Sequence, residues 1–264
     1  MFFFKFKKQK NSQQDNEFVD KEIKKIPKVI SIIFFVYIVL FLALMIWLFY
    51  FKATYYISPV QGTSMQPTIN PDIVSQTDST DFVYVNSRKA GTYGDIVTID
   101  VGAEKPIIKR IIGTQGDLVS IYIADDGYYH VAMLYKNTRN VVVLNEDYIK
   151  SYSLWTSARE GILQNEVIYE KQFYDTFLNG ATNLEIIDGV LFYEIPENFY
   201  FCLGDNRAVS SDSRSRGVFN KDQIKGVAEI IVKDGNINSG WLLGKKISAI
   251  SAYYWEKIEN SFAR

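Results

Sequence analysis

The chain of 264 residues holds a single histidine and a single cysteine, and this scarcity limits the chemistry open to it. One cysteine leaves no partner for an intrachain disulfide. His130 and Cys202 cannot supply the three or four ligands of a usual zinc site, so we expect no metal centre. A serine triad would have to use His130, and a thiol dyad would have to pair Cys202 with it. Nucleophilic chemistry in this chain therefore favours another base.

Ser64 is the candidate nucleophile, and it lies in the run GTSMQPT at residues 62–68. Glycine and proline flank the serine, which is typical of a tight turn. Taken alone the signal is weak, because surface loops are rich in serine. The assignment of Ser64 as a nucleophile becomes convincing only together with two later segments of the chain, 107–112 and 204–214.

Lys109 is the candidate base, and it lies in the apolar run IIKRII at residues 107–112. In a strand alternate residues share a face, so Lys109 lies between Ile107 and Ile111 on one side and Arg110 lies on the other. An edge strand would leave such a lysine solvated. A desolvated lysine would instead have a lowered pKa, and its neutral amine could accept a proton from a serine.

A third segment, GDNRAVSSDSR at residues 204–214, combines turn formers, hydroxyl groups and two Asp/Arg pairs. A polar surface loop is the simplest interpretation. However, it directly follows the apolar run 199–203, which has the character of a buried strand. A polar loop anchored on a core strand is a common place for a site.

With the N-terminal apolar segment, these segments resemble bacterial type I signal peptidases, which are serine–lysine endopeptidases. The resemblance rests on four boxes in order: GTSMQPT at 62–68, GDIV at 94–97, KRIIGTQGD at 109–117 and GDNRAVSSDSR at 204–214. It implies a membrane-bound enzyme that cleaves N-terminal signal peptides from secreted preproteins, with Ser64 as nucleophile and Lys109 as general base. It implies no cofactor, and it names signal peptides and the lipid bilayer as partners.

The resemblance also assigns supporting roles. Ser210 is implied to hydrogen-bond the Lys109 amine and orient it, as a carboxylate orients histidine elsewhere. Asp212 and Arg214 are implied to form a supporting ion pair. Further implied roles are Arg110 and Asp205 as polar scaffold, Met65 as packing beside the nucleophile, and Pro67 as the residue that shapes the turn.

The oxyanion site departs from part of the family. Some members have serine two positions before the nucleophile, where its hydroxyl helps bind the oxyanion, but this chain has Gly62. The backbone amide of Ser64 remains available as one donor, and Thr63 is adjacent. A single such donor is typically worth about 3 kcal/mol.

Residues 29–51 form an uncharged run of 23 residues between Lys28 and Lys52, long enough to span a membrane as a helix. The run is too long for a cleaved signal and lacks a small-residue cleavage site. The tail 1–28 holds eight lysines against four acids, whereas residues 29–264 carry a net charge of −5. The positive-inside rule therefore places the N-terminus in the cytoplasm and the following domain outside the cell membrane. The overall charge of −1 gives no reason to expect nucleic-acid binding.

The region 52–240 is predicted to be a mainly β extracytoplasmic domain, with a less typical insert at about 126–198. Short β-like runs are broken by turn residues, without regular helices between them. In 241–264 apolar residues recur at steps of three or four positions. This spacing predicts an amphipathic helix that packs on the domain or on the membrane surface. The fold expected from the resemblance is the complex β-fold of signal peptidases. The predicted strands are 82–86, 95–100, 106–112, 118–124, 128–135, 141–144, 190–194, 200–203 and 227–232.

Two other functions stay open from the residues alone. A sortase-like transpeptidase would share the anchor and the β domain and would use Cys202, although that residue lies in an apolar strand where a small buried thiol is more common. A non-catalytic, membrane-tethered domain that binds peptides would share the architecture but would not need both Ser64 and Lys109.

Overall fold

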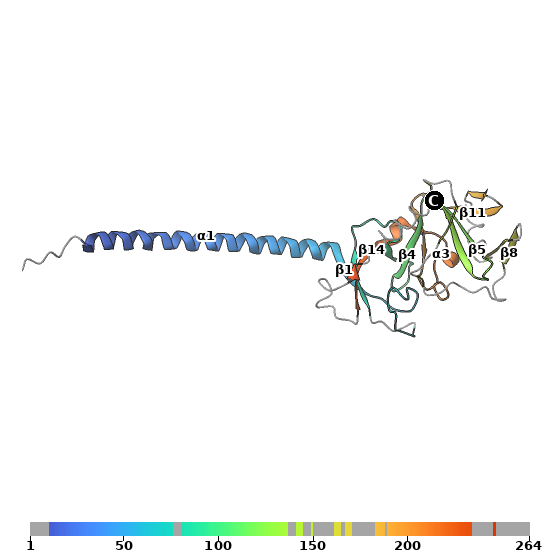
Figure 1. Ribbon diagram of the computed structural model, residues 1–264, viewed down its shortest axis with the longest axis horizontal. Helices are drawn as coiled ribbons and strands as arrows, with labels where there is room; N and C mark the ends of the chain where they lie inside the picture. Colours follow the sequence, from blue (N-terminus) through green and yellow to red (C-terminus); the bar gives the residue numbers. More distant parts are fainter. Residues whose placement is uncertain are drawn as a thin grey trace, which may run out of the picture. The chain divides into compact units, whose positions relative to one another are not determined.

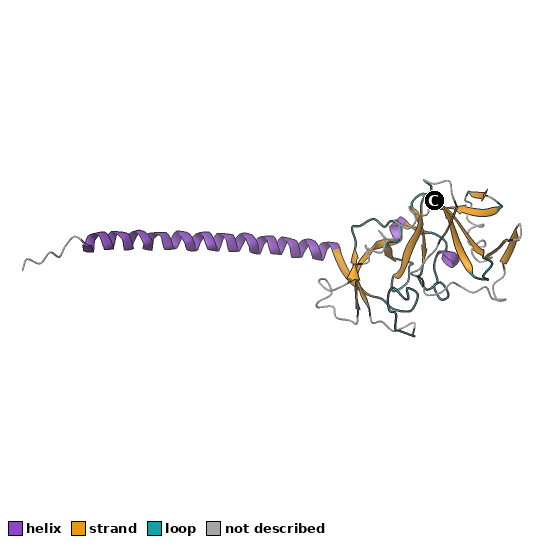
Figure 2. Cartoon of the chain, in the orientation of Figure 1, coloured by secondary structure: helices purple, strands orange, loops and turns teal. Residues whose placement is uncertain are grey.

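The computed structural model describes residues 11–75, 81–136, 141–144, 149, 161–164, 167–170, 183–187, 189–233 and 245–246. The chain divides into two compact units, residues 1–53 and residues 54–264. The first is helical and the second is built mainly of strands (Figure 2).

Helix α1 runs from Asn11 to Thr54 and contains the predicted membrane segment. Its part Lys28–Thr54 is the one described helix that is long and apolar enough to cross a membrane. At 1.5 Å per residue those 27 residues extend about 40 Å, more than the hydrocarbon core of a bilayer. Large apolar side chains from Val29 to Tyr50 are exposed along it, which fits a helix surrounded by lipid rather than by protein.

The larger sheet of the second unit carries most of the candidate residues. Its strand order is β1-β2-β14-β3-β4-β12-β13, with β15 pairing β14. All of its strand pairs are antiparallel, and β4, β14 and β1 are labelled in Figure 1. Its strands are β1 (Tyr55–Pro59), β2 (Phe82–Asn86), β3 (Ile96–Ile99), β4 (Ile107–Thr114), β12 (Phe199–Leu203), β13 (Phe219–Asn220), β14 (Ile224–Val232) and β15 (Lys245–Lys246).

The second sheet has the order β10-β11-β5-β6-β7, and a hairpin of β8 and β9 joins it through β5. Two short helical turns, α3 (Ser213–Arg216) and η1 (Lys221–Gln223), lie between strands of the first sheet in the chain. The strands of the second sheet are β5 (Leu118–Ile123), β6 (Tyr129–Leu134), β7 (Val142–Val143), β8 (Gly161–Gln164), β9 (Val167–Glu170), β10 (Leu184–Ile187) and β11 (Val190–Glu194).

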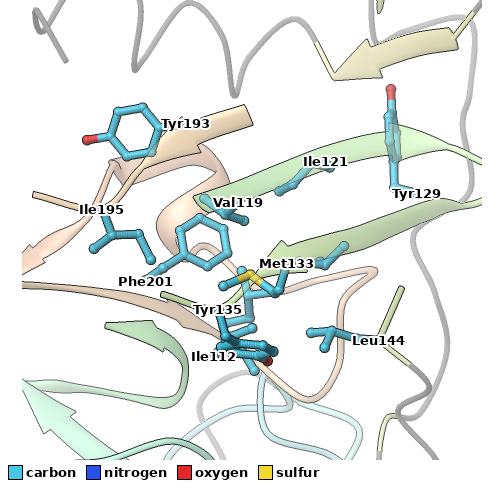
Figure 3. Packing of buried hydrophobic residues seen from close by; sticks show 12 residues of the cluster. Ile112, Val119, Ile121, Tyr129, Met133, Tyr135, Leu144, Tyr193, Ile195 and Phe201 are labelled. Atoms are coloured by element: carbon cyan, nitrogen blue, oxygen red, sulfur yellow. The ribbon is translucent and has the colours of Figure 1, made fainter. Parts of the chain in front are cut away.

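Strand β4 connects the cores of the second unit, which explains why its two cations are buried. Ile112 belongs to the largest apolar cluster, where Phe201, Met133 and Val119 meet (Figure 3). Ile108 belongs to a second cluster and Ile111 to a third. Because apolar groups cover both faces of β4, neither Lys109 nor Arg110 can reach bulk water, and their exposed fractions are 3% and 0%.

The mainly β prediction is confirmed, and every predicted strand overlaps an observed one. The prediction omitted β1, β8, β9, β10, β13 and β15. The predicted helix over 241–264 falls outside the described residues except at Lys245–Lys246, where it is wrong. There the chain forms β15 against Ile230 and Ile231, because β3 pairs β14 only as far as Ala228 and leaves that edge open.

Candidate active site

Ser64 lies in a loop that follows β1, and a glycine defines the loop's entry. Gly62 has φ 84°, in the left-handed region that glycine adopts without strain, so a serine at this position would be disfavoured. Ser64 is partly exposed, whereas its neighbours Thr63 and Met65 are buried. The loop therefore presents one hydroxyl at the surface from an otherwise buried turn.

Lys109 reaches this hydroxyl from β4. Its Nζ lies 3.1 Å from Ser64 Oγ, although the two residues are 45 positions apart in sequence. The same nitrogen donates a hydrogen bond of 2.7 Å to the carbonyl oxygen of Ile108. A partly exposed hydroxyl next to a buried amine is the arrangement that a serine nucleophile and its base require.

Burial lowers the pKa of the Lys109 amine to about 8, because desolvation penalises its charged form. The carboxylate of Asp212 opposes this shift, and the nearby guanidinium of Arg216 reinforces it. The lysine can therefore lose its proton near neutral pH, which an exposed lysine would not do.

The loop after β12 lies next to this pair because of the strand register. In the antiparallel pairing of β12 with β4, Leu203 lies opposite Arg110, so the chain leaves β12 beside Lys109. Asn206 then binds the backbone of residues 62–68, the nucleophile loop. Its N–H donates to the Ser64 carbonyl at 2.9 Å and its Nδ2 donates to the Thr63 carbonyl at 3.0 Å. A Cβ atom at Gly204 would lie 2.6 Å from the Ser64 carbonyl oxygen. This is too close for a carbon atom, so only glycine fits where the two loops meet.

The comparisons with known proteins point to one family. The family model described as "Signal peptidase, peptidase S26" matches residues 29–233. Signal peptidase I P of Bacillus subtilis subsp. natto is 31% identical over 219 residues, covering 80% of this chain and 93% of its own. The chain belongs to the S26 signal peptidase family. The predicted resemblance is thereby confirmed.

Other relatives are more distant. Signal peptidase I of Streptococcus pneumoniae serotype 4 is 27% identical over 64% of this chain and 78% of its own. A crystal structure of a signal peptidase I from Enterococcus faecalis V583 covers 53% of this chain and 97% of its own, at 22% identity and a TM-score of 0.29. That last likeness is too slight to add to the family assignment.

Two buried ion pairs lie near Ser64 and Lys109. Arg110 binds Asp205 through two parallel bonds, from Nε at 2.8 Å and from Nη2 at 2.6 Å, and both side chains are fully buried. Asp212 accepts bonds from Arg214 Nε at 2.9 Å and from Nη2 at 3.0 Å, the ion pair that the resemblance implied. Asp212 also accepts the N–H of Gly204 at 3.0 Å, which ties the ion pair to the start of the loop.

The ionised form of Asp212 is favoured despite burial. Desolvation alone would raise the pKa of its carboxyl, but the Arg214 guanidinium and the hydrogen bond from Gly204 outweigh it, and the pKa lies below its ordinary value. The carboxylate therefore remains charged as the strongest negative influence on the Lys109 amine.

Ser210 departs from its expected contact. Its Oγ is buried and makes no hydrogen bond to Lys109 in the described part of the chain. Its hydroxyl instead contributes to lowering the pKa of the neighbouring Asp212 carboxyl. The amine is instead oriented by the carbonyl oxygen of Ile108, which already accepts a hydrogen bond from it at 2.7 Å. Gly204 leaves room for the Ser210 hydroxyl, since a Cβ there would lie 2.2 Å from Ser210 Oγ.

The Ser64 N–H is the candidate oxyanion donor that the sequence analysis proposed. Within the described residues the Ser64 N–H donates to no protein acceptor, so it is free to bind a developing negative charge. Thr63 is 7% exposed, and Met65 packs at 1% exposure in the cluster with Val60 and Ile108. Pro67 is exposed at the outer side of the turn, after a cis peptide bond.

Sequence reasoning missed three polar residues that hold the nucleophile loop: Asn206, Asn70 and Asp81. Asn206 lies inside the fourth box, where only its neighbours received roles. Asn70 precedes Pro71, a dipeptide that marks a turn and could have identified it. Asp81 carries no local signal. No group of three metal-ligating side chains occurs among the residues described.

The lowered pKa of Lys109 predicts a specific pH dependence of cleavage. The base must be neutral to accept the serine proton, so kcat/KM should rise about tenfold per pH unit below 8 and level off above it. At pH 7 only about a tenth of the molecules would hold a neutral amine. A profile of initial rates between pH 5 and pH 10 measures this limb, and a limb centred near pH 10 would contradict a desolvated base.

Proposed function

We propose that the protein is a membrane-anchored signal peptidase in which Ser64 and Lys109 form the catalytic dyad. Lys109 Nζ takes the proton of Ser64 Oγ as that oxygen attacks the carbonyl carbon of the scissile peptide. The oxyanion so formed accepts a hydrogen bond from the Ser64 N–H. As the C–N bond breaks, Lys109 returns the proton to the leaving amine, and an ester to Ser64 remains. Lys109 then takes a proton from a water that attacks the ester carbonyl, and it returns this proton to Ser64 Oγ as the C–O bond to the serine breaks.

The observation that carries this proposal is the 3.1 Å approach of the Lys109 amine to the Ser64 hydroxyl, in a chain of the S26 family. An amine buried to 3% exposure beside a partly open hydroxyl has the burial and pKa that a general base needs. A non-catalytic peptide-binding domain would gain nothing from an expensive buried lysine.

The substrates we propose are signal peptides of secretory preproteins, with small side chains at the −1 and −3 positions. The peptide would add as a β-strand beside residues 57–61, which comprise the last three residues of β1 and the two that follow it. The buried cluster of Val60, Met65 and Ile108 lies next to the dyad and would form the apolar wall of shallow pockets.

The proposed topology is a single pass with the N-terminus in the cytoplasm and the catalytic unit outside. It rests on the excess of lysine before residue 29 and on the apolar helix Lys28–Thr54. An anchor only about ten residues before Ser64 would keep enzyme and membrane-bound preprotein in the same plane, at a high effective concentration.

The function is tested with the full chain reconstituted in liposomes and a preprotein that carries a cleavable signal peptide. We expect a single cut, located by N-terminal sequencing of the product after a small residue. An added primary amine should not become joined to the released signal peptide. Absence of cleavage, or transfer to the amine, would overturn the assignment as a signal peptidase.

Replacing Cys202 separates the dyad from a sortase-like mechanism. Cys202 is fully buried, burial raises the pKa of its thiol, and its strand β12 packs against β4. We expect Cys202→Ala to cleave the preprotein within about threefold of the parent rate, since only packing is changed. Complete loss of cleavage in a folded Cys202→Ala protein would favour a thiol nucleophile.

A further inference from the structure

The nucleophile loop is closed at its base by Asn70, a residue outside the four boxes. Asn70 is fully buried and has φ 54°, a left-handed conformation that asparagine tolerates. Its Nδ2 donates to the carbonyl oxygen of Val60 at 2.7 Å and to that of Gly62 at 3.3 Å. One side chain therefore holds the loop at its start and beside the nucleophile turn.

Asp81 locks Asn70 in this position through reciprocal bonds. The Asn70 N–H donates to Asp81 Oδ2 at 2.7 Å, and the Asp81 N–H donates to Asn70 Oδ1 at 2.9 Å. The Val60 N–H donates to the Asp81 carbonyl at 3.1 Å. Both ends of the loop are thus fixed to the residue that precedes β2.

Lys233, at the end of β14, completes the network. Its Nζ binds Asp81 Oδ2 at 2.6 Å and donates to the Thr68 carbonyl at 3.3 Å. The Asp81 carboxylate is 1% exposed and would be a costly buried charge without this partner, whereas the lysine is 38% exposed. A surface-accessible cation therefore stabilises a buried anion that orients Asn70.

The network bears on the reacting groups through peptide orientation. The carbonyl of Gly62 is held by Asn70, and the carbonyls of Thr63 and Ser64 are held by Asn206. In a trans peptide the N–H points away from the carbonyl of the same plane. The Ser64 N–H shares its plane with the Thr63 carbonyl, which Asn206 holds. Asn70 holds the preceding plane through the Gly62 carbonyl, so it acts on the Ser64 N–H and Oγ through the backbone of residues 60–63.

We propose that Asn70, Asp81 and Lys233 form a positioning network that sets the Ser64 hydroxyl and N–H for attack. This inference rests on the proposed roles of Ser64 and Lys109. The network does not contact the dyad, so it acts through the backbone of residues 60–64, on the geometry of the transition state more than on ground-state binding. A misplacement of about 1 Å at a reacting group can cost 100-fold in rate.

Asn70→Gly is the first test, because glycine accepts the left-handed backbone and removes only the side chain. We expect kcat for preprotein cleavage to fall about 10- to 100-fold while KM changes less than threefold. The acid limb of the pH profile should not move. The matched control is Asn198→Gly, which removes the other left-handed asparagine of the described residues, at an exposed site, and should keep the parent kcat.

A network variant keeps the test decisive if Asn70→Gly fails to fold. Lys233→Met strands the Asp81 carboxylate and should lower kcat about tenfold, whereas Asp81→Asn combined with Lys233→Met removes the buried charge and should recover most of it. Rates are expressed per folded molecule, from thermal unfolding curves. Parent kcat in folded Asn70→Gly, or no recovery in the double variant, overturns the inference. Inactivity of the parent chain would instead overturn the proposed function.

Discussion

Replacing Ser64 with alanine should reduce preprotein cleavage by about 10⁴-fold or more without unfolding the protein. The hydroxyl is the proposed nucleophile, and removing the nucleophile of a serine peptidase leaves only the contribution of oxyanion binding and substrate binding. Ser64 is partly exposed and its hydroxyl contacts the Lys109 amine, so little packing is lost. The measurement is single-turnover cleavage in liposomes, with unfolding followed by circular dichroism.

Lys109→Met should cause a loss of similar size, because methionine fills the buried space but cannot accept a proton. The double variant should be no slower than either single one, since the two groups act as a unit. The controls are Ser211→Ala, at an exposed hydroxyl beside Ser210, and Lys225→Met, at an exposed lysine of β14. Cleavage above about 1% of the parent rate in either dyad variant would sink the Ser–Lys mechanism.

The second large effect concerns stability. Asp205→Ala should lower the free energy of unfolding by about 3–5 kcal/mol, because it leaves the Arg110 guanidinium buried without its charge partner. Both side chains are fully buried, and Thr68 Oγ1 also donates to Asp205, which links the pair to the nucleophile loop. Urea unfolding of the second unit within the full chain measures the change.

An exposed ion pair provides the control for this effect. Asp100 and Lys225 lie 3.2 Å apart with exposed fractions of 46% and 47%, so water screens their attraction. Lys225→Met, which removes the pair but keeps the Asp100 carboxylate that accepts the Gly102 N–H, should therefore leave the urea midpoint within experimental scatter. A loss below 1 kcal/mol in Asp205→Ala would mean that Arg110 finds another anion or reaches water, contrary to its burial.

The sequence alone predicted the elements that depend on local pattern. The uncharged run at 29–51 predicted a helix because its composition leaves few alternatives, and α1 contains it. Alternation around Lys109 predicted a strand with a cation on each face, and β4 has both cations buried. The scarcity of histidine and cysteine favoured a lysine base before any geometry was known.

The pairing of strands could not be predicted from the sequence, because two strands that are distant in the chain leave no shared local pattern. The short strands β13 and β15 and the strand β1 have little pattern of their own and exist because neighbours offer open edges. The same holds for Lys245 and Lys246, which lie inside the predicted helix 241–264 but pair with the edge of β14 that β3 leaves open beyond Ala228.

Sequence and tertiary structure therefore determined different parts of this protein. Residue type and spacing made Ser64 and Lys109 candidates, and the resemblance to signal peptidases added Asp212 and Arg214 as a supporting ion pair. Only the tertiary structure decided that Lys109 is desolvated next to Ser64, that its amine donates to the Ile108 carbonyl, and that Asn70 closes the loop. Those outcomes depend on burial and on contacts between distant strands, which exist only once the chain has folded.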